Sequence, residues 1–321
     1  MVTWRRDDKA GVEFGRSLII ANPASRSGRG AGAAVLVGRF FDCYGSLTDG
    51  HELVLTEGPG DAHQLAAGSA GFDTVFSLGG DGLAHEVACG LMEVPAGRRP
   101  RFALIPMGSG NDLARTFHAT RNDPDHAIAE LVSGKERSMD LGRVNDTYFV
   151  QTLSFGMDAA IALDTTRRRA EDATQRGAAL FATSGVRLFS SGMRGWAFEA
   201  TCDGEPLEGT DIVFAVQNGP TYGGGFRVCP DADPADGRLD LCYSRRRPHS
   251  ATALGLFGLA RLGLHTHSSV LAFRDLSRLD VRFPEGPPPC QADGERLDAD
   301  EYHVTDEPAA LRVLVPAACP W

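Results

Sequence analysis

The chain has 321 residues, of which 42% are hydrophobic and 23% charged, and its formal net charge is −10. This length suits two domains that each bury a core, and the composition is typical of globular proteins. The acidic balance argues against a nucleic-acid partner, because neutralising phosphates requires concentrated Lys and Arg. Two short arginine runs, 167–169 and 245–247, stand against this background. Each could contact anionic phosphates or lipid headgroups, or lie in a solvated loop.

The seven cysteines are scattered, odd in number and without a CxxC pair. This usage is typical of reduced thiols in a cytoplasmic protein. Residues 1–15 lack the apolar core of a secretory signal, and the longest apolar stretch, 251–264, falls short of the roughly 20 residues that cross a bilayer. We therefore expect a cytoplasmic protein whose membrane contact is peripheral, at the inner membrane surface. The sequence leaves open whether the protein forms a homodimer.

Short aliphatic runs alternate with helical segments in the first part of the chain. Four runs predict strands, at residues 17–21, 51–56, 74–78 and 101–105. Helices are predicted between and after them, over 30–41 and beginning at residues 61, 83 and 112. This alternation predicts a Rossmann-like α/β domain with a parallel sheet, whose ligand loops lie at the carboxyl ends of the strands. We assign residues 1–139 to this nucleotide-binding domain and expect a C-terminal strand within 306–321 to return to it.

The pattern changes after Asp140 to short strands separated by hairpin signals, such as Asn145-Asp146 and Asp203-Gly204. It predicts an antiparallel β-sandwich-like domain over residues 140–305, which would hold the substrate and metal sites. A helical insertion, about Ala160 to Phe189, interrupts it.

Two glycine-rich loops each follow a predicted strand and open a predicted helix. The first is Gly79-Gly80-Asp81-Gly82 and the second is Gly108-Ser109-Gly110-Asn111-Asp112. Glycines let backbone N–H groups and a helix N-terminus approach an anion closely, so a phosphate fits here. The Asp81 carboxylate would then hold a magnesium ion or a hydroxyl beside the phosphates; the alternative is that it only caps its helix. Neighbouring loops of this kind predict a nucleotide cleft, although neither the GxxxxGK[ST] nor the GxGxxG spacing is present.

Two further stretches carry acidic turns. Asp233 and Asp236 lie in PDADPADGRLD, where closely spaced oxygen ligands suit a hard cation, and a plain hairpin turn is the alternative. The tripeptide Asp-Gly-Glu occurs twice, at 203–205 and 293–295. Asp-Gly is a strong hairpin signal, so the earlier copy is interpreted as a turn.

Six segments in order resemble the diacylglycerol kinase catalytic domain family, which includes bacterial lipid kinases and the sphingosine and ceramide kinases. They are NPASRSG, SLGGDG, PMGSGNDLAR, DLGRVNDTYFVQTLSFGMDA, VQNGPTYGGGFRVCPDADPADGRLDL and ADGERL. The resemblance implies an ATP- and Mg²⁺-dependent kinase that phosphorylates a hydroxyl of diacylglycerol or a related lipid alcohol at a membrane surface. Another alcohol, such as a sphingoid base, a polyprenol or a soluble metabolite, is the first alternative. A catalytically weak paralogue that binds nucleotide or lipid is the second.

The resemblance also implies roles for individual residues. ATP would be bound by Asn22, Ser27, Gly28, Thr56, Gly79, Gly80, Gly82, Gly108, Ser109, Gly110 and Asn111. Asp81 would lie near the phosphates, Asp112 would be important for the site, and Asp140 would join a water-mediated network to magnesium. Asp233, Asp236 and the carbonyl of Arg238 match a structural magnesium site. The catalytic base lies in Asp293-Gly294-Glu295, and the sequence leaves open which carboxylate it is.

The chain departs from the family pattern at two positions. Leu83 and His85 stand where the family usually has Thr and Asn. Leu83 lacks the hydroxyl of the usual Thr, and the loss of one hydrogen bond costs about 1 kcal/mol of stabilisation. His85 either substitutes as a donor or lies on the helix surface. The helical insertion also has no clear Lys at the usual family position, which puts lipid engagement there in doubt.

Overall fold

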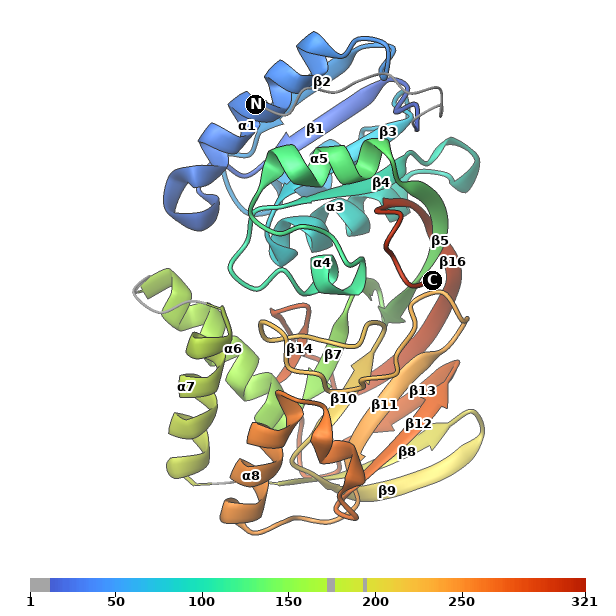
Figure 1. The fold of residues 1–321 in the computed structure, drawn as a ribbon. Helices are drawn as coiled ribbons and strands as arrows, with labels where there is room; N and C mark the ends of the chain where they lie inside the picture. The colour runs from blue at the N-terminus through green and yellow to red at the C-terminus, as the bar shows by residue number, and fades with distance from the viewer. Residues whose placement is uncertain (1–11, 172–176, 193–194) are drawn as a thin grey trace.

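The computed structural model describes residues 12–171, 177–192 and 195–321. Its N-terminal lobe alternates strands and helices (Figure 1). The elements are β1 (Ser17–Ala21), α1 (Ser25–Cys43), β2 (His51–Leu55), α2 (Asp61–Ala67), β3 (Thr74–Gly79), α3 (Asp81–Glu93), a 3₁₀ turn (Ala96–Arg98), β4 (Arg101–Pro106), α4 (Asp112–Thr116) and α5 (Pro124–Val132). Strands lie in the order β2-β1-β3-β4 and all pair in parallel. Parallel neighbours require a crossover, which the helices supply.

The C-terminal lobe is rich in strands. Its elements are β5 (Lys135–Val144), β6 (Thr147–Phe149), β7 (Thr152–Phe155), α6 (Gly156–Glu171), α7 (Gly177–Ser190), β8 (Trp196–Cys202), β9 (Glu205–Asp211), β10 (Phe214–Gln217), β11 (Leu239–Ser244), α8 (Ser250–Ala260), a 3₁₀ turn (Leu264–His267), β12 (Leu271–Leu276), β13 (Arg278–Arg282), β14 (Cys290–Ala292), β15 (Glu295–Leu297) and β16 (Glu301–Val315). Six of the strands form an antiparallel sheet in the order β12-β11-β10-β7-β14-β15. The predicted fold class is confirmed.

The long strand β16 connects the two lobes. Its first part pairs antiparallel with β13, and its end pairs in parallel with β4 through Val313 and Leu314. β5 pairs antiparallel with β16 along most of β16, with an irregularity between Glu307 and Leu311. One sheet therefore extends from β2 through β16 to β8 and β9. The two lobes share this sheet, and the C-terminal lobe has the six-stranded sheet in addition.

Apolar side chains fill both faces of the N-terminal sheet. Successive residues of a strand point to opposite faces. Ile19 accordingly packs with Phe14 and Phe76 on one side, while Ile20 packs with the cluster of Phe102 on the other. In the C-terminal lobe the core lies between the two sheets and is rich in aromatic rings, among them Phe155, Phe198, Phe214 and Tyr302.

The structure contains more helices than the sequence predicted. The single insertion expected over about 160–189 consists of two helices, α6 and α7, and α5 and α8 were not predicted. α6, α7 and α8 lie together beside the antiparallel sheet (Figure 1). Among the described residues, no helix combines the length and the apolar character needed to cross a bilayer.

Candidate active site

The two glycine loops touch each other at the carboxyl ends of β3 and β4. These strands are neighbours, with Gly79 opposite Pro106. A Cβ atom on Gly108 would lie only 2.5 Å from the Cα of Gly80, and a Cβ on Gly110 would lie 2.7 Å from Oδ2 of Asp81. Only glycine fits at these points, because any side chain would displace the facing backbone or the carboxylate.

Asp81 binds the helix of the other loop. Its Oδ1 accepts the backbone N–H of Asp112 at 2.7 Å and that of Leu113 at 3.3 Å. Asp81 is thus fixed by the N-terminus of α4, while α3, which it begins, has no side-chain cap. Burial raises the pKa of Asp81, and the hydrogen bonds from α4 and the charge of Arg169 oppose this rise.

Asp112 joins the second glycine loop to the C-terminal lobe. Its Oδ2 accepts the backbone N–H of Gly224 at 2.7 Å, and Arg115 Nε lies 3.4 Å from Oδ1. Burial, followed by the charge of Asp81, raises the pKa of Asp112 to about 6. Two neighbouring carboxylates, of which Asp112 is buried and Asp81 half-buried, favour the presence of a cation or of hydrogen-bond donors between the lobes.

A cleft of about 400 Å³ lies along the three turns at the sheet edge. Seven of the predicted nucleotide-binding residues line it: Asn22, Ser27, Gly80, Gly82, Gly108, Ser109 and Gly110. Left-handed backbone at Arg26, Ser27 and Gly28 bends the first turn before α1 becomes regular. Leu83 lines the cleft too and packs over Gly79, so this departure from the family pattern is an apolar wall.

Four predicted nucleotide ligands lie outside this lining: Gly28, Thr56, Gly79 and Asn111. Asn111 is buried and closes its own loop, because its side chain accepts the N–H of Gly108 at 2.8 Å and donates to the Gly108 carbonyl at 2.9 Å. Thr56 extends the ladder of β1, since its N–H donates to the Ala21 carbonyl at 2.9 Å. Both residues shape the turns, and neither lines the cleft.

A second cleft, of about 230 Å³, meets the first at Asp81. It lies between the lobes and is lined by Asp112, Asp293 and Glu295 among others. The two clefts share Asp81, Gly82, Gly110 and Arg169. A group held in the first cleft therefore lies next to a group held in the second.

The two carboxylates of the Asp-Gly-Glu turn differ in their surroundings. Asp293 is 5% exposed and accepts the backbone N–H groups of Val150, Gln151 and Thr152 at 2.5 to 3.0 Å. It also lies 2.9 Å from Nδ1 of His85. Glu295 is exposed in the same cleft, and its carboxylate pairs with no other side chain in the described ranges.

His85 is buried, so the expectation that it could lie on the helix surface is wrong. Burial alone would lower its pKa, but the hydrogen bond to Asp293 and the contact with Cys89 raise this pKa well above the ordinary value. The raised pKa favours the imidazolium form of His85, paired with Asp293. Because α3 belongs to one lobe and Asp293 to the other, this pair joins the two lobes.

Comparisons with known proteins identify the family of the chain. The model of the diacylglycerol kinase catalytic domain matches residues 16–144, and that of the YegS C-terminal NAD kinase β-sandwich-like domain matches residues 151–315. The chain belongs to the diacylglycerol kinase catalytic domain family. The expectation of an enzyme of the lipid kinase family is confirmed.

Relatives of this family match over most of the chain. A diacylglycerol kinase of Mycobacterium tuberculosis is 29% identical over 311 residues, which are 95% of this chain and 96% of that protein. A Yersinia enterocolitica protein named "Probable lipid kinase YegS-like" is 32% identical over 264 residues, 81% of this chain and 85% of its own. The crystal structure of a diacylglycerol kinase from Bacillus anthracis str. Sterne superposes with a TM-score of 0.77 at 18% identity, covering 95% of this chain and 98% of that one. At this level of identity, the superposition shows that the two chains share a fold.

The acidic turn that resembles the family's magnesium site lies away from both clefts. Asp233 and Asp236 accept the backbone N–H groups of Ala235 and Arg238. Asp140 accepts those of Gly237 and Ala309, at 2.8 and 2.6 Å. Within the described chain no cluster of three or more His, Cys, Asp or Glu side chains is arranged to hold a metal. A cation here would need the Arg238 carbonyl or water as further ligands.

Asp306 is a member of this acidic region that sequence reasoning missed. Both of its carboxylate oxygens are buried without a hydrogen-bond partner. Burial, followed by the charges of Asp140 and Asp236, raises its pKa to about 7. An orphaned carboxylate among acidic neighbours fits a hard cation such as Mg²⁺. Only the position of Asp306 in the long strand β16 brings it here, and no motif marks it.

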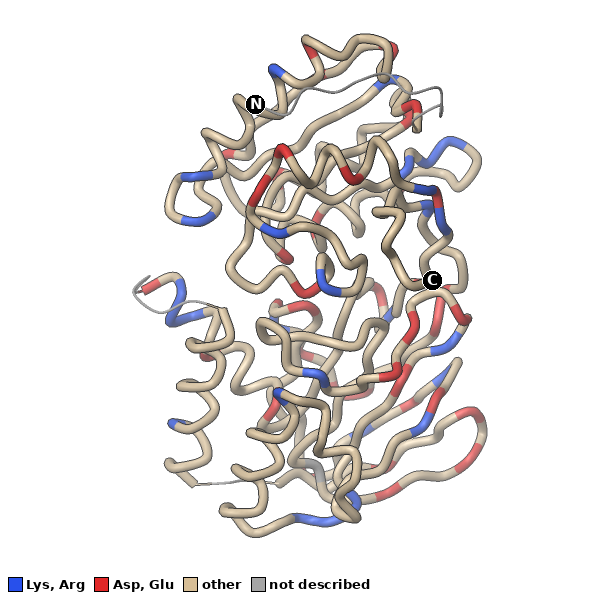
Figure 2. The backbone as a smooth tube through the Cα atoms, viewed as in Figure 1, with Lys and Arg blue, Asp and Glu red and all other residues tan. Residues whose placement is uncertain are grey.

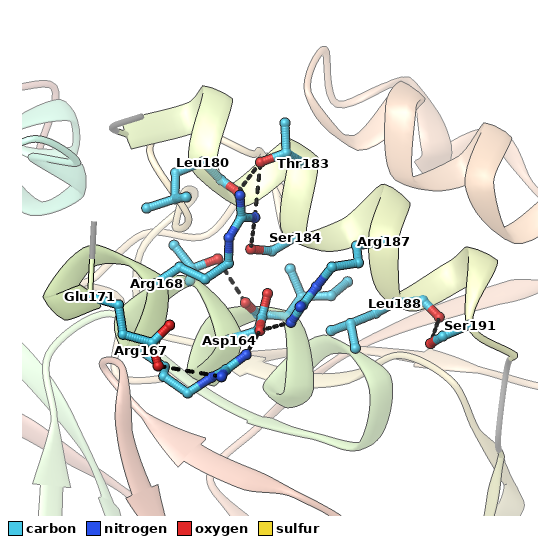
Figure 3. A network of polar contacts seen from close by, with 12 residues as sticks. Asp164, Arg167, Arg168, Glu171, Leu180, Thr183, Ser184, Arg187, Leu188 and Ser191 are labelled. Carbon is cyan, nitrogen blue, oxygen red and sulfur yellow. Dashed lines mark hydrogen bonds and ion pairs between the residues drawn. The ribbon is translucent and has the colours of Figure 1, made fainter. Parts of the chain in front are cut away.

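The arginine run of α6 divides between two tasks (Figure 3). Arg167 pairs with Asp164 at 2.8 Å, and Arg168 donates to Thr183 and Ser184 of α7 at 3.0 and 2.9 Å. Asp164 also accepts from Arg187 of α7. The contacts of Arg168 and the Asp164–Arg187 pair hold the two helices together, whereas the Arg167–Asp164 pair lies within α6. Successive helical residues point about 100° apart, and Arg169 lines both clefts.

Proposed function

We propose that the protein transfers the γ-phosphoryl group of ATP, with Mg²⁺, to a hydroxyl group of diacylglycerol or a related lipid alcohol. The observation that carries this proposal is the junction of the two clefts at Asp81. One cleft presents backbone amides and glycines, as phosphates require, and the other presents an exposed carboxylate, as a hydroxyl acceptor requires.

The nucleotide would lie along the three turns of the first cleft. Backbone N–H groups near Gly80, Gly82 and Ser109 would donate to the phosphates, and Arg169 would add a positive charge at the junction of the clefts. Asp81, fixed by two N–H groups of α4, would orient the cation that accompanies ATP. That cation would neutralise charge on the transferred group.

Glu295 would be the catalytic base. A base must reach the acceptor hydroxyl with a free lone pair, and the oxygens of Asp293 are already occupied by three N–H groups and His85. Asp293 would therefore fix the turn, and Glu295 would take the hydroxyl proton as the new P–O bond forms. Holding both reactants in line supplies most of the rate enhancement for such a transfer.

An apolar cavity behind the second cleft supports a lipid acceptor. The two share Phe181 and Tyr222, and the cavity continues between α6, α7, α8 and the antiparallel sheet. Its further walls include Ile161, Phe189, Ile212, Val228 and Leu256. The free volume is about 50 Å³, so an acyl chain would enter as the helices move apart. The names of the relatives, diacylglycerol kinase and lipid kinase, point to the same class of acceptor.

A phosphorylation assay over a panel of acceptors tests the proposal. Purified protein would be incubated with labelled ATP, Mg²⁺ and micelles of diacylglycerol, a sphingoid base or a polyprenol, with glycerol as a soluble alcohol. We expect phosphorylation of diacylglycerol or one related lipid, and its loss in Glu295→Gln. Transfer to glycerol alone would replace the lipid acceptor by a soluble one. ATP binding without transfer to any member would favour a nucleotide-binding paralogue.

A further inference from the structure

The helix α8 is apolar on both of its sides. Its 11 residues, Ser250–Ala260, include no charged side chain. Ala253, Leu256, Phe257 and Ala260, at helical spacing, line the apolar cavity. The other side carries Leu254 and Leu259, which are about 40% exposed. A helix at a water interface normally places polar residues outward, so this outer side calls for a partner.

Exposed apolar side chains gather at this helix and the segment that follows it. Nine large hydrophobic residues are exposed among those described, and five of them lie between residues 254 and 273: Leu254, Leu259, Leu262, Leu264 and Phe273. Leu262 is the most exposed of all, at 65%. Arg261 is exposed as a residue, but its guanidinium donates to the Gly225 carbonyl and lies 5.8 Å from the Phe226 ring centroid, on the side of the cavity. Clusters of this kind mark interaction surfaces.

Positive charge borders this surface on an otherwise acidic chain. The exposed run Arg245-Arg246-Arg247 leads from β11 into α8. Figure 2 shows the blue run at the start of the helix and no charge along the helix itself. Arg245 and Arg246 form no ion pair with any carboxylate of the described ranges. Arginines beside an apolar helix complement anionic headgroups above an acyl layer.

We propose that α8 and residues 261–264 dock the protein on the surface of a bilayer that contains anionic lipids. Leu254, Leu259, Leu262 and Leu264 would enter the acyl boundary, and the arginine run would contact the headgroups. This inference rests on the proposed lipid acceptor, because docking places the apolar cavity between the bilayer and the acceptor cleft. A bilayer fits better than a protein partner, since the same helix also lines the cavity that a lipid chain would enter.

Co-sedimentation of the full chain with vesicles tests this docking without ATP. The vesicles are phosphatidylcholine alone or phosphatidylcholine mixed with phosphatidylglycerol. Wild type should sediment with the mixed vesicles, less so at high salt. Leu262→Glu with Leu264→Glu should weaken partitioning roughly tenfold or more, because two leucines no longer enter an apolar phase. Arg245→Gln with Arg246→Gln should abolish the preference for anionic vesicles.

The matched control is Val35→Glu with Leu36→Glu on α1, where two apolar side chains are similarly exposed in the other lobe. It should sediment like wild type, and melting curves would verify that all variants fold. The docking proposal is overturned if wild type stays in the supernatant with both vesicles, or if the control loses as much binding as the leucine variant. It is also overturned if the leucine variant only converts a dimer to a monomer. Docking without phosphorylation of any lipid would remove the proposed function alone.

Discussion

The tripeptide Asp-Gly-Glu occurs twice in this chain, and the two copies have almost the same backbone. Asp203 and Asp293 have φ angles of 47° and 48°, and the following glycines have φ angles of 89° and 95°. In both turns the Asp carboxylate accepts backbone N–H groups from a neighbouring segment. Local sequence therefore determines the turn and the use of its first carboxylate, as expected for Asp-Gly in left-handed backbone.

The surroundings of the two turns differ. Asp203 pairs with Arg238 at the surface, where its side chain is 34% exposed. Asp293 pairs with buried His85 of the other lobe. Glu205 lies in the β8–β9 hairpin, at the edge of the long sheet, whereas Glu295 faces the cleft that holds Asp81. The chemical role of each turn depends on the residues that the fold places opposite it. The turn at 203–205 therefore serves as a control for the turn at 293–295.

The largest expected difference concerns the two glutamates. Glu295→Gln should lower kcat by roughly 10² to 10⁴, the usual contribution of a positioned base, with little change in melting temperature. Glu205→Gln, in the matching turn, should leave kcat unchanged. Steady-state assays of both purified variants measure this, and equal kcat values for the two would remove Glu295 from the mechanism.

The two aspartates should differ in stability. Asp293→Asn leaves a buried imidazolium without its counter-charge, which costs about 3 to 5 kcal/mol in the free energy of unfolding. Asp203→Asn weakens a surface pair and keeps an oxygen for the backbone, so about 1 kcal/mol or less is expected. Urea denaturation gives both values. A similar loss in the two variants would show that the His85–Asp293 pair is not a charged contact.

Arg169 and Arg167 provide a second comparison, within one helix. Arg169→Ala should lower kcat/KM for ATP by about a hundredfold, since it removes a positive charge from the junction of the clefts. Arg167→Ala removes contacts with Asp164 and Glu171 of the same helix, outside the lining of both clefts, and should leave kcat/KM within error. If Arg167→Ala is the more damaging change, the junction does not hold the phosphates.

The smallest expected effect is a pH dependence of the melting temperature, which only the buried turn at Asp293 confers. The folded-state pKa of His85 is raised, so its pair with Asp293 stabilises fully below the unfolded pKa of about 6.5. This contribution is lost as the pH rises through the folded-state pKa. The difference in melting temperature between wild type and His85→Asn should therefore shrink from pH 6 upward. A difference that stays constant or grows with pH would contradict a charged His85.

Much of this arrangement could be predicted from the sequence, because it depends on local signals. Aliphatic runs followed by glycine turns indicated the parallel sheet. The two loops approach each other closely only because they contain glycines, and these glycines can be identified in the sequence. His85 shows what local signals lack: a histidine on a helix gives no sign of a carboxylate 208 positions later. Asp306 was missed for the same reason, since its neighbours come from distant segments. Arg169 was predicted only as one of a run that could contact phosphates, and the run itself does not show which of its arginines faces the clefts.

The sequence predicted a C-terminal strand in the first lobe, but not that the same strand begins in the second. Only the pairing of β16 with both β4 and β13 reveals that it joins the lobes. Likewise, α8 is apolar on both of its sides, so the spacing of its residues gives no helical pattern from which to predict it. Tertiary partners decided both outcomes.

The most direct test of the account is a crystal structure with a non-hydrolysable ATP analogue and Mg²⁺. The account predicts the phosphates against Gly80, Gly82 and residues 108–110, with the terminal phosphate directed toward Glu295 and within reach of Arg169. A nucleotide bound away from these loops, or one whose terminal phosphate points away from the second cleft, would contradict it.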